Sequence, residues 1–515
     1  MQNTSIQFET LNPAVVNYIK DLESSVNKYK QQYFELKEKY DVIMYQKYCR
    51  SAERMRTEEN YPSLFVEETE NTISLEPETE KQEIKSYTRK KPGRKPINPN
   101  IPRVDVIIEI PESERKCACN AIMTKIGEEI SEKIEIIPQT IKVKRIRRFK
   151  YACRHCEGTE NEDEKVVKTA PVPPCMIPKS MATASLLSHI MIQKYQDHLP
   201  FYRQQTLFSR FGIEISRQDM SNWQQQVYEK LLPLFTFLKD NLKNGPVIRM
   251  DETTVQVMGE EGRSDIDKSY MWLARGGPPD KTVVLYKYKE TRAGYNAKEI
   301  LEGYTGYLQT DGYSGYDAAV AGIPEIIQVG CFAHARRKFF EASKVTKTPQ
   351  SAEEGIKYIR KLYDLENDLR KEILNDSEFV NKRKERAVPI LSDFRAWLNK
   401  RANEVLPSGK LGEAVAYTLK QWDKLVAYLE SPYLTPDNNA AENAIRPFVL
   451  GRKNWLFNKS PKGAESSCGI YSLIETAKQN GIEPFKYLHQ LFEDAPLAVS
   501  TEDWEKLLPW NIFKN

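Results

Sequence analysis

Apolar residues near the amino-terminal end recur at alternating intervals of four and three residues. This spacing places one apolar stripe along a helix and is typical of the a and d positions of a coiled coil. A single amphipathic helix lying on the chain's own globular body is the alternative. About four heptads with charged or polar residues between the apolar ones favour self-association of residues 1–50. The stripe consists of Val15, Ile19, Leu22, Val26, Tyr29, Tyr33, Leu36, Tyr40 and Ile43, and its three tyrosines predict a weak zipper.

Apolar periodicity is absent from residues 51–103, where the chain is first acidic and then basic and rich in proline. This composition is typical of a disordered linker, because it offers too little apolar surface for a core. Its basic end has a Pro-Gly-Arg-Lys-Pro core, which can lie in a narrow minor groove of DNA, where the negative potential attracts arginine. A solvated linker without DNA contact is the alternative. The candidate DNA-binding residues are Arg89, Lys90, Lys91, Arg94 and Lys95.

Two close cysteine pairs lie within residues 104–170. The pairs are Cys117 with Cys119 and Cys153 with Cys156. Between them, alternating isoleucine and charged residues over 134–148 predict a pair of strands. Four thiolates from two turns can hold Zn²⁺ tetrahedrally without a large core. The segment therefore predicts a zinc-ribbon-like structural site with His155 as a substitute ligand, and isolated reduced thiols are the alternative.

A proline-rich hinge at residues 171–178 precedes a stretch, about 181–238, in which apolar residues recur at helical spacing. Within it, Gly212 ends one helix, and Ser216 with Asp219 forms a capping box that begins another. This layout predicts a helical domain over 171–242 with a helix-turn-helix. Arg217, Gln218 and Asn222 would lie near the start of its second helix, where base-reading residues are found. The same helix pair also occurs in domains that bind no DNA.

Residues 243–340 follow the order strand, strand, strand, helix, strand, short helix, strand. The predicted strands are residues 246–257, 269–275, 282–288, 306–310 and 326–333, with a helix near 297–301 and a basic helix start at His334. Asp251 lies in the first strand and Asp311 at the end of the fourth, so both carboxylates reach one edge of a mixed sheet. An acid in the middle of a strand is unfavourable unless it binds something.

A third acid follows a predicted helical insertion over residues 341–433, in which Trp397 and Trp422 are expected in the core. The helix that begins after Thr435-Pro436-Asp437 places Glu442 and Arg446 on one face. Glu252 adjoins Asp251 but points to the opposite face of a regular strand, so we leave it outside the triad. A lone strand aspartate is more often a solvated edge residue or a turn cap. Three acids in this order favour a metal site.

At these motifs the sequence resembles the insertion sequence 66 family of DDE transposases over nearly the whole chain. Each motif alone is weak, but their order and spacing are specific to that family. One departure is the C-x-C pair at Cys117, where the usual spacing is C-x-x-C. Besides the zipper and the cysteine segment, the motifs are Asp251-Glu252-Thr253, Thr310-Asp311-Gly312-Tyr313, Gly330-Cys331-Phe332-Ala333-His334-Ala335-Arg336-Arg337-Lys338, Asn438-Asn439-Ala440-Ala441-Glu442 and Gly451-Arg452-Lys453-Asn454.

The resemblance implies a multidomain α+β protein with an N-terminal coiled coil, a zinc segment, a helical DNA-binding domain and a ribonuclease-H-like mixed-sheet catalytic core. The long helical insertion divides this core, whose second part is residues 434–515. Asp251, Asp311 and Glu442 would be the catalytic triad and would hold two Mg²⁺ ions for in-line phosphoryl displacement. Phosphates would be held by His334, Arg336, Arg337, Lys338, Arg446, Arg452 and Lys453.

The composition limits how the implied partners can be bound and which kinds of partner are expected. Among 515 residues, 76 basic and 72 acidic side chains give a net charge of +4, so DNA must be bound through local basic patches. Eight cysteines are too few for a disulfide scaffold in a chain of this length. We expect a cytoplasmic, nucleoid-associated bacterial protein with no membrane partner, because the sequence shows neither a signal peptide nor a long apolar run. The expected partners are transposon-end and target DNA, at least one further copy of the chain, and candidate accessory proteins of the same element.

Two other functions remain open. One is a catalytically silent DNA-binding regulator descended from a transposase, which would use only the zipper, the zinc segment and the basic linker. An intact triad argues against it, because DNA binding alone does not require those acids. The other is a ribonuclease-H-like nuclease without strand transfer, which the reaction products would distinguish: joined strands indicate a transposase and nicked strands alone a nuclease.

Overall fold

The computed structural model describes residues 141–152, 167–345 and 349–513, and parts of a helix between residues 17 and 40. The chain divides into two compact units, Met1–Glu67 with Pro173–Asn515, and Glu68–Val172. In the second unit, β1 (Lys150–Ala152) pairs antiparallel with β2 (Val167–Thr169). The four predicted zinc ligands, Cys117, Cys119, Cys153 and Cys156, and the basic residues Arg89 to Lys95 lie outside the described residues.

The strand pair predicted for residues 134–148 is wrong over its described part. Residues 141–149 contain no strand, and the first paired residue is Lys150. The side chains of Val143 and Ile146 are exposed, so the alternation of isoleucine and charge has no packed layer to face. Alternation predicts a strand only where one face becomes buried against another element.

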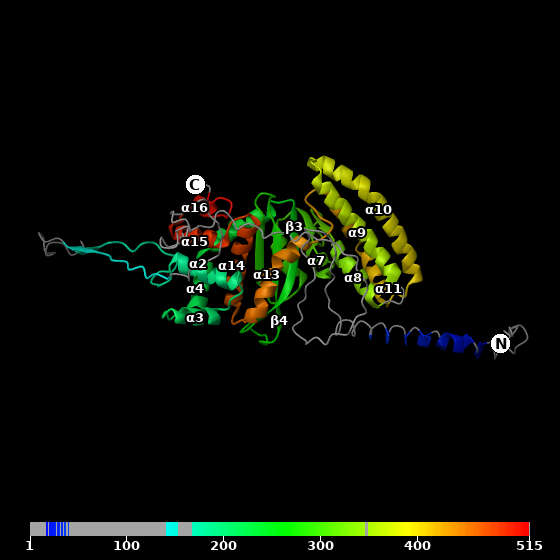
Figure 1. Cartoon of the computed structure of the whole chain (residues 1–515), viewed down its shortest axis with the longest axis horizontal. Coiled ribbons are helices and arrows are strands. Elements are labelled where there is room, and N and C mark those ends of the chain that lie inside the picture. Colours follow the sequence, from blue (N-terminus) through cyan, green and yellow to red (C-terminus); the bar gives the residue numbers. More distant parts are fainter. Residues whose placement is uncertain are drawn as a thin grey trace, which may run out of the picture. The chain divides into compact units, whose positions relative to one another are not determined.

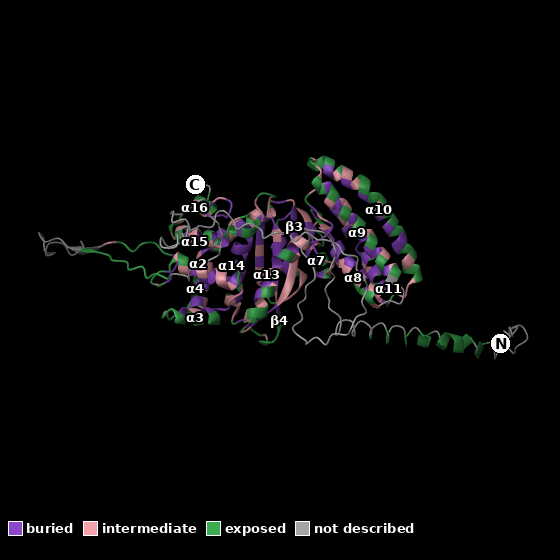
Figure 2. Cartoon of the chain, in the orientation of Figure 1, coloured by how far each residue is buried: buried purple, intermediate pink, exposed green. Residues whose placement is uncertain are grey.

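The amino-terminal periodicity correctly predicts a helix, since the described residues between 17 and 40 are helical. Leu22, Val26, Tyr29 and Leu36 of the heptad series are all exposed in this single chain, and the described part of the helix is coloured as exposed in Figure 2. The described part of the stripe is therefore an accessible apolar surface in the isolated chain.

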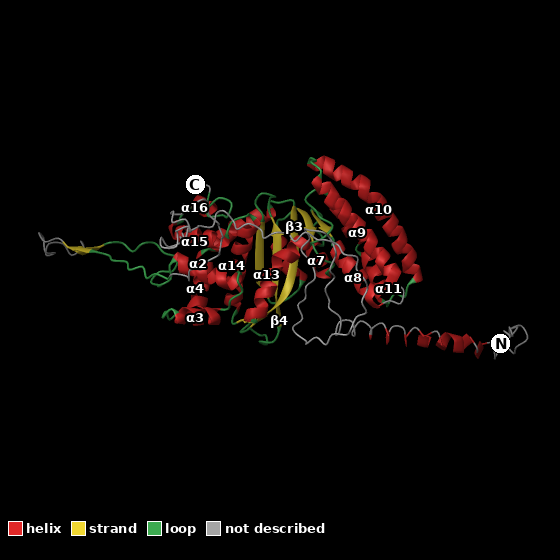
Figure 3. Ribbon diagram, in the orientation of Figure 1, coloured by secondary structure: helices red, strands yellow, loops and turns green. Residues whose placement is uncertain are grey.

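A six-stranded mixed sheet forms the centre of the Pro173–Asn515 unit (Figures 1 and 3). Its strand order is β5-β4-β3-β6-β7, with β8 beside β3. β3, β4 and β5 pair antiparallel, whereas β6, β7 and β8 run parallel to their partners. The strands are β3 (Val247–Val257), β4 (Lys268–Gly276), β5 (Val283–Lys289), β6 (Gly306–Gln309), β7 (Ile326–Val329) and β8 (Phe457–Asn458).

The element order predicted for residues 243–340 is confirmed, except at the end of its last strand. That strand was predicted to reach residue 333, but β7 ends at Val329 and α8 (Phe332–Val345) begins three residues later. The backbone N–H of Gly330 donates to Lys424 (2.9 Å), and that of Phe332 donates to Pro436 (2.9 Å). These bonds draw the backbone away from the sheet, so the apolar run becomes the start of a buried helix.

Helices cover both faces of the sheet. On one face lie α13 (Asn439–Trp455) and α14 (Pro461–Gln479), which cross the strands in Figure 1. The Tyr286 hydroxyl of β5 donates to the carbonyl of Ala444 on α13. On the other face lie α6 (Gly294–Leu301) and α7 (Ser314–Val320), and Tyr316 of α7 packs edge-on against Trp272 of β4. Because side chains alternate along a strand, neighbouring residues of β3 meet different helix layers.

The helical stretch predicted over residues 181–238 is four helices. The predicted turn between the second and third is confirmed: Gly212 has a φ of +72°, and Ser216 and Asp219 form a capping box. Two further helices and a 3-10 turn near the carboxyl end pack in the same unit. The elements are α2 (Ala184–Tyr195), α3 (Phe201–Arg210), α4 (Arg217–Lys230), α5 (Leu232–Lys243), α15 (Pro484–Asp494), η4 (Ala495–Leu497) and α16 (Thr501–Lys506).

The insertion is helical, as predicted, and packs around a second hydrophobic cluster, which also includes Val247 of β3, Val329 of β7 and Phe332 of α8. Trp397 and Trp422 are buried in it, as the sequence indicated. No helix among the described residues is long and apolar enough to cross a membrane. The elements after α8 are α9 (Pro349–Lys371), α10 (Asp376–Glu404), α11 (Lys410–Lys420), α12 (Trp422–Val426) and η3 (Ala427–Glu430).

Candidate active site

Asp251 lies in the middle of β3, on the face covered by α13. One of its carboxylate oxygens, Oδ1, accepts a hydrogen bond from the backbone N–H of Glu252 (2.8 Å). Burial raises the pKa of Asp251 well above its usual range, and the negative charges of Glu252, Glu442 and Asp311 raise it further. The carboxylates of the two other predicted triad members are therefore close enough to act on Asp251.

Asp311 follows β6 by two residues, at the turn that leads into α7. Its Oδ1 accepts the backbone N–H of Tyr313 (2.9 Å), which closes a local turn typical of aspartate. The neighbouring Gly312 has no room for a side chain, because a Cβ there would lie 2.7 Å from the hydroxyl of Tyr417. Glycine at this position allows α11 of the insertion to pack against the turn that carries Asp311.

Glu442 lies in the first turn of α13, where the helix dipole favours a negative charge. Burial raises the pKa of this carboxyl, Arg337 and Arg446 lower it, and Asp437 and Asp311 raise it. Its Oε1 is buried and has no hydrogen-bond partner among the described residues. A carboxylate oxygen in this situation is available to a ligand.

Arginines and amides hold the loop that leads into α13. Arg383 of α10 is fully buried, donates to Glu366 (2.7 Å) and stacks near the ring of Phe379. The loop contacts are Arg383 to the carbonyls of Tyr428 (2.8 Å), Ser431 (2.7 Å) and Leu434 (3.1 Å), Arg370 to Leu434 (3.1 Å), Arg249 to Tyr433 (2.8 Å), Gln309 to Thr435 (2.6 Å) and Asn438 to Met250 (2.8 Å). Two of these arginines belong to the insertion, which thus helps to fix the start of the helix that carries Glu442.

Glu252 belongs to a separate network on the opposite face of β3. It accepts a hydrogen bond from Arg292 (2.7 Å) and another from the hydroxyl of Tyr316. The guanidinium of Arg292 also lies over the ring of Tyr313, 3.9 Å from its centroid. Burial raises the pKa of Glu252, and its hydrogen bonds to Tyr316 and Arg292 lower it. Our sequence analysis did not predict these partners, because no local pattern marks an ion pair across 40 residues.

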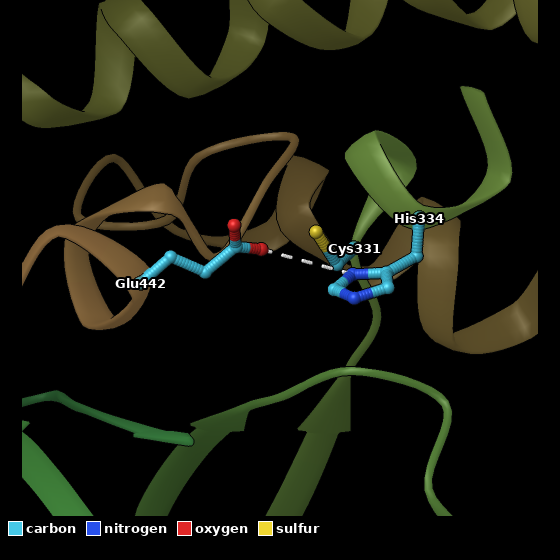
Figure 4. Close-up of side chains that lie close together, drawn as sticks. All are labelled: Cys331, His334 and Glu442. Atoms are coloured by element: carbon cyan, nitrogen blue, oxygen red, sulfur yellow. Dashed lines mark ion pairs between the residues drawn. The ribbon is translucent and has the colours of Figure 1, made fainter. Parts of the chain in front are cut away.

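His334 and Cys331 lie beside Glu442 (Figure 4). The Nδ1 of His334 is 3.9 Å from Oε1 of Glu442. Burial lowers the pKa of His334, Arg337 and Lys338 lower it too, and Asp311 raises it, so the imidazole is neutral at pH 7. The sulfur of Cys331 accepts the backbone N–H of Asn438 (3.2 Å), and burial raises the pKa of this thiol.

The carboxylate cluster fits a divalent cation. Buried acids that repel one another cost free energy unless a positive charge lies among them. Oε1 of Glu442 has no hydrogen-bond partner among the described residues, and burial with neighbouring acids raises the pKa of Asp251. Carboxylate oxygens are the ligands that Mg²⁺ prefers. Among the described residues, the ligand atoms that lie within 4.8 Å of one another belong to Cys331, His334 and Glu442.

The predicted phosphate-binding residues do not all lie together. Arg337 and Arg446 are near enough to lower the pKa of Glu442. The side chain of Arg336 is largely buried and interacts electrostatically with Tyr363 of the insertion. Lys338 lies over the ring of Tyr417, 5.0 Å from its centroid.

Arg452 and Lys453 line a cavity of about 360 Å³ beside the second half of β3. Arg452 donates to the hydroxyls of Thr253 (3.2 Å) and Thr254 (3.1 Å), and burial lowers its pKa. These threonines follow Asp251 along the same strand. The cavity therefore lies further along β3 from the acidic cluster and presents positive charge there.

A family model described as "Transposase IS66 family" matches residues 179–466, which is more than half of the chain. The chain belongs to this family. Models described as "zinc-finger binding domain of transposase IS66", "IS66 C-terminal element" and "Transposase C of IS166 homeodomain" match residues 114–157, 472–510 and 35–106. The resemblance identified from the sequence motifs is thus confirmed, and the zinc-finger match spans all four predicted cysteine ligands.

Curated relatives from Sinorhizobium fredii support this membership without adding a function. "Uncharacterized protein y4jD" is 30% identical over 423 residues, which are 80% of each chain. "Uncharacterized protein y4qI" is 30% identical over 477 residues, which are 89% of this chain and 85% of the relative. The similarity therefore extends well beyond the region that the transposase family model matches.

Proposed function

We propose that the protein is a DDE-type transposase that binds the ends of its element, cleaves DNA strands there and joins a 3′-hydroxyl to target DNA. The observation that carries this proposal is the convergence of Asp251, Asp311 and Glu442 from three separate elements. Two of these acids raise the pKa of the third. Membership of the transposase family supports the same reaction.

The sheet supports assignment of a ribonuclease-H-like core. Three antiparallel strands are followed by two parallel ones, in the order β5-β4-β3-β6-β7. The acids lie on the first of these strands, after the fourth, and on a helix that follows the insertion. This is the placement that such a catalytic core requires.

In this proposal Asp251, Asp311 and Glu442 bind Mg²⁺. Two such ions, when bound, activate an attacking water or 3′-hydroxyl and stabilise the leaving oxygen of the phosphodiester. Arg337 and Arg446, close to Glu442, would hold the phosphate that carries the scissile bond. The hydrogen bonds that fix the loop before α13 would keep Glu442 in place while the DNA strand is cleaved and joined.

DNA recognition is assigned to the parts that precede the sheet. Arg217, Gln218 and Asn222 are accessible at the start of α4, behind the capped turn. Zn²⁺ held by Cys117, Cys119, Cys153 and Cys156 would organise a second DNA-binding module, with the basic residues Arg89 to Lys95 beside it. A second copy of the chain would cover the exposed heptad residues, because both ends of an element must be held together.

The test is incubation of labelled DNA from the element's flanking ends with the protein and Mg²⁺. Asp251→Asn is compared with Asp240→Asn, which removes an exposed aspartate of α5 as a matched control. We expect cleaved and joined strands from the wild type and the control, and DNA binding without cleavage from Asp251→Asn. Cleavage retained in Asp251→Asn contradicts the assignment. Nicks without joining indicate a nuclease, and binding without cleavage by the wild type indicates a regulator.

A further inference from the structure

A ring nitrogen and a carboxylate oxygen face each other at the candidate active site, within ion-pair distance but without a hydrogen bond between them. Nδ1 of His334 and Oε1 of Glu442 are 3.9 Å apart, which is too far for a hydrogen bond (Figure 4). Both atoms are buried, and neither has a hydrogen-bond partner among the described residues. Buried polar atoms are nearly always satisfied by the protein, by water or by an ion.

The separation suits two ligands of one metal ion. Imidazole nitrogen and carboxylate oxygen each bind a first-row divalent metal at about 2.0–2.2 Å, so an ion lying between the two atoms can reach both. Asp311 lies near His334, since its charge raises the pKa of this imidazole, and it brings a further oxygen to the same region.

The backbone holds these two ligand atoms in a fixed relation. His334 lies in the first turn of α8, and Glu442 in the first turn of α13. The N–H of Phe332 donates to the carbonyl of Pro436 (2.9 Å), and the N–H of Asn438 donates to the sulfur of Cys331 (3.2 Å). The two helix starts are thus joined directly, as a preformed metal site requires.

We infer that His334 is a metal ligand, whose Nδ1 shares one divalent ion with Oε1 of Glu442. The inference rests on the proposed function and extends it, because an all-carboxylate triad needs no nitrogen ligand. Ligand atoms of Cys331, His334 and Glu442 all lie within 4.8 Å of one another, and the sulfur of Cys331 also accepts the N–H of Asn438; the inference is confined to the nitrogen of His334. A nitrogen ligand favours a transition-metal ion over Mg²⁺ at this position, since imidazole suits transition metals and Mg²⁺ prefers oxygen, and Mn²⁺ serves here as the paramagnetic probe.

The probe is Mn²⁺ alone, added to the full-length protein labelled with ¹⁵N-histidine. Electron spin echo spectroscopy detects coupling between bound Mn²⁺ and a ligating nitrogen, and a titration gives the affinity. We expect ¹⁵N coupling in the wild type, its loss in His334→Gln, and binding weakened by about tenfold or more. His489→Gln is the control, because His489 is a partly exposed residue of α15 and should leave both quantities unchanged.

Absence of ¹⁵N coupling in the wild type overturns the inference, and no variant has to fold for that result. Unchanged Mn²⁺ affinity in a folded His334→Gln protein overturns it too and assigns His334 to phosphate instead. The proposed function fails separately, if Asp251→Asn still cleaves DNA. In that case ¹⁵N coupling would still demonstrate the histidine ligand.

Discussion

Arg383 offers the sharpest test of how the insertion supports the candidate active site. We consider Arg383→Met, which keeps a long unbranched side chain but removes the charge and all donors. The native guanidinium is fully buried and binds the carbonyls of Tyr428, Ser431 and Leu434 as well as the carboxylate of Glu366. All four acceptors lose a charged hydrogen bond in the variant.

The size of the stability loss depends on which of these acceptors keep another hydrogen-bond donor. Leu434 and Glu366 keep Arg370, at 3.1 Å and 2.7 Å, and Ser431 keeps the N–H of Leu434 at 3.2 Å. The carbonyl of Tyr428 loses the arginine with no such replacement, and a buried polar group without a partner costs about 1–3 kcal/mol. Removing one member of a buried ion pair costs about 3–5 kcal/mol when the other is left alone. Because Arg370 remains beside Glu366, we expect a loss of about 2–4 kcal/mol in the free energy of unfolding.

The assay is urea unfolding followed by tryptophan fluorescence, since Trp397 and Trp422 report on the insertion. Arg386→Met is the matched control on the same helix, because Arg386 is exposed and pairs with the accessible Glu372. Its unfolding should match that of the wild type. A loss below about 1 kcal/mol in Arg383→Met would refute the reasoning that this buried network holds the loop before α13.

Three further predictions concern Asp251, Gly451 and the amino-terminal heptad stripe. Burial and neighbouring acids raise the folded-state pKa of Asp251, so the metal-free protein should gain stability as the pH falls through that pKa towards the unfolded value of about 3.9. In urea unfolding, Asp251→Asn should be more stable than the wild type at pH 7 and should lack this pH-dependent gain in stability. Identical pH profiles of the two proteins would contradict the prediction. Gly451→Ala should lower the free energy of unfolding by about 1–3 kcal/mol in the same assay, although alanine has the better helix propensity, because its Cβ would lie 2.4 Å from the Tyr471 hydroxyl. Equal stability of variant and wild type would show that this contact relaxes. Deleting residues 1–45 should lower the mass measured by light scattering, and an unchanged oligomer would count against the zipper.

Local patterns were sufficient to predict most elements around the candidate site. Asp251 was assigned to a strand and Glu442 to a helix start, and both elements form at those positions. The two wrong strand predictions have different causes. At residues 141–149 no layer covers the alternating side chains, and at Gly330 bonds to distant carbonyls draw the chain out of the sheet. Whether an apolar run is a strand depends on what packs against it.

Local sequence patterns are enough to predict the order of elements, the capped turn at Ser216, the heptad stripe and the three candidate acids. Each is a pattern of neighbours within a few turns of chain, where spacing sets which side chains share a face. The burial of Arg336, the pairing of Glu252 with Arg292 and the approach of His334 to Glu442 depend on the folded chain. These contacts join residues that are far apart in the sequence, up to 108 positions from His334 to Glu442, and no local periodicity predicts such a contact. Burial then decides their energetics, because a charge costs little in water and much in the interior without a partner.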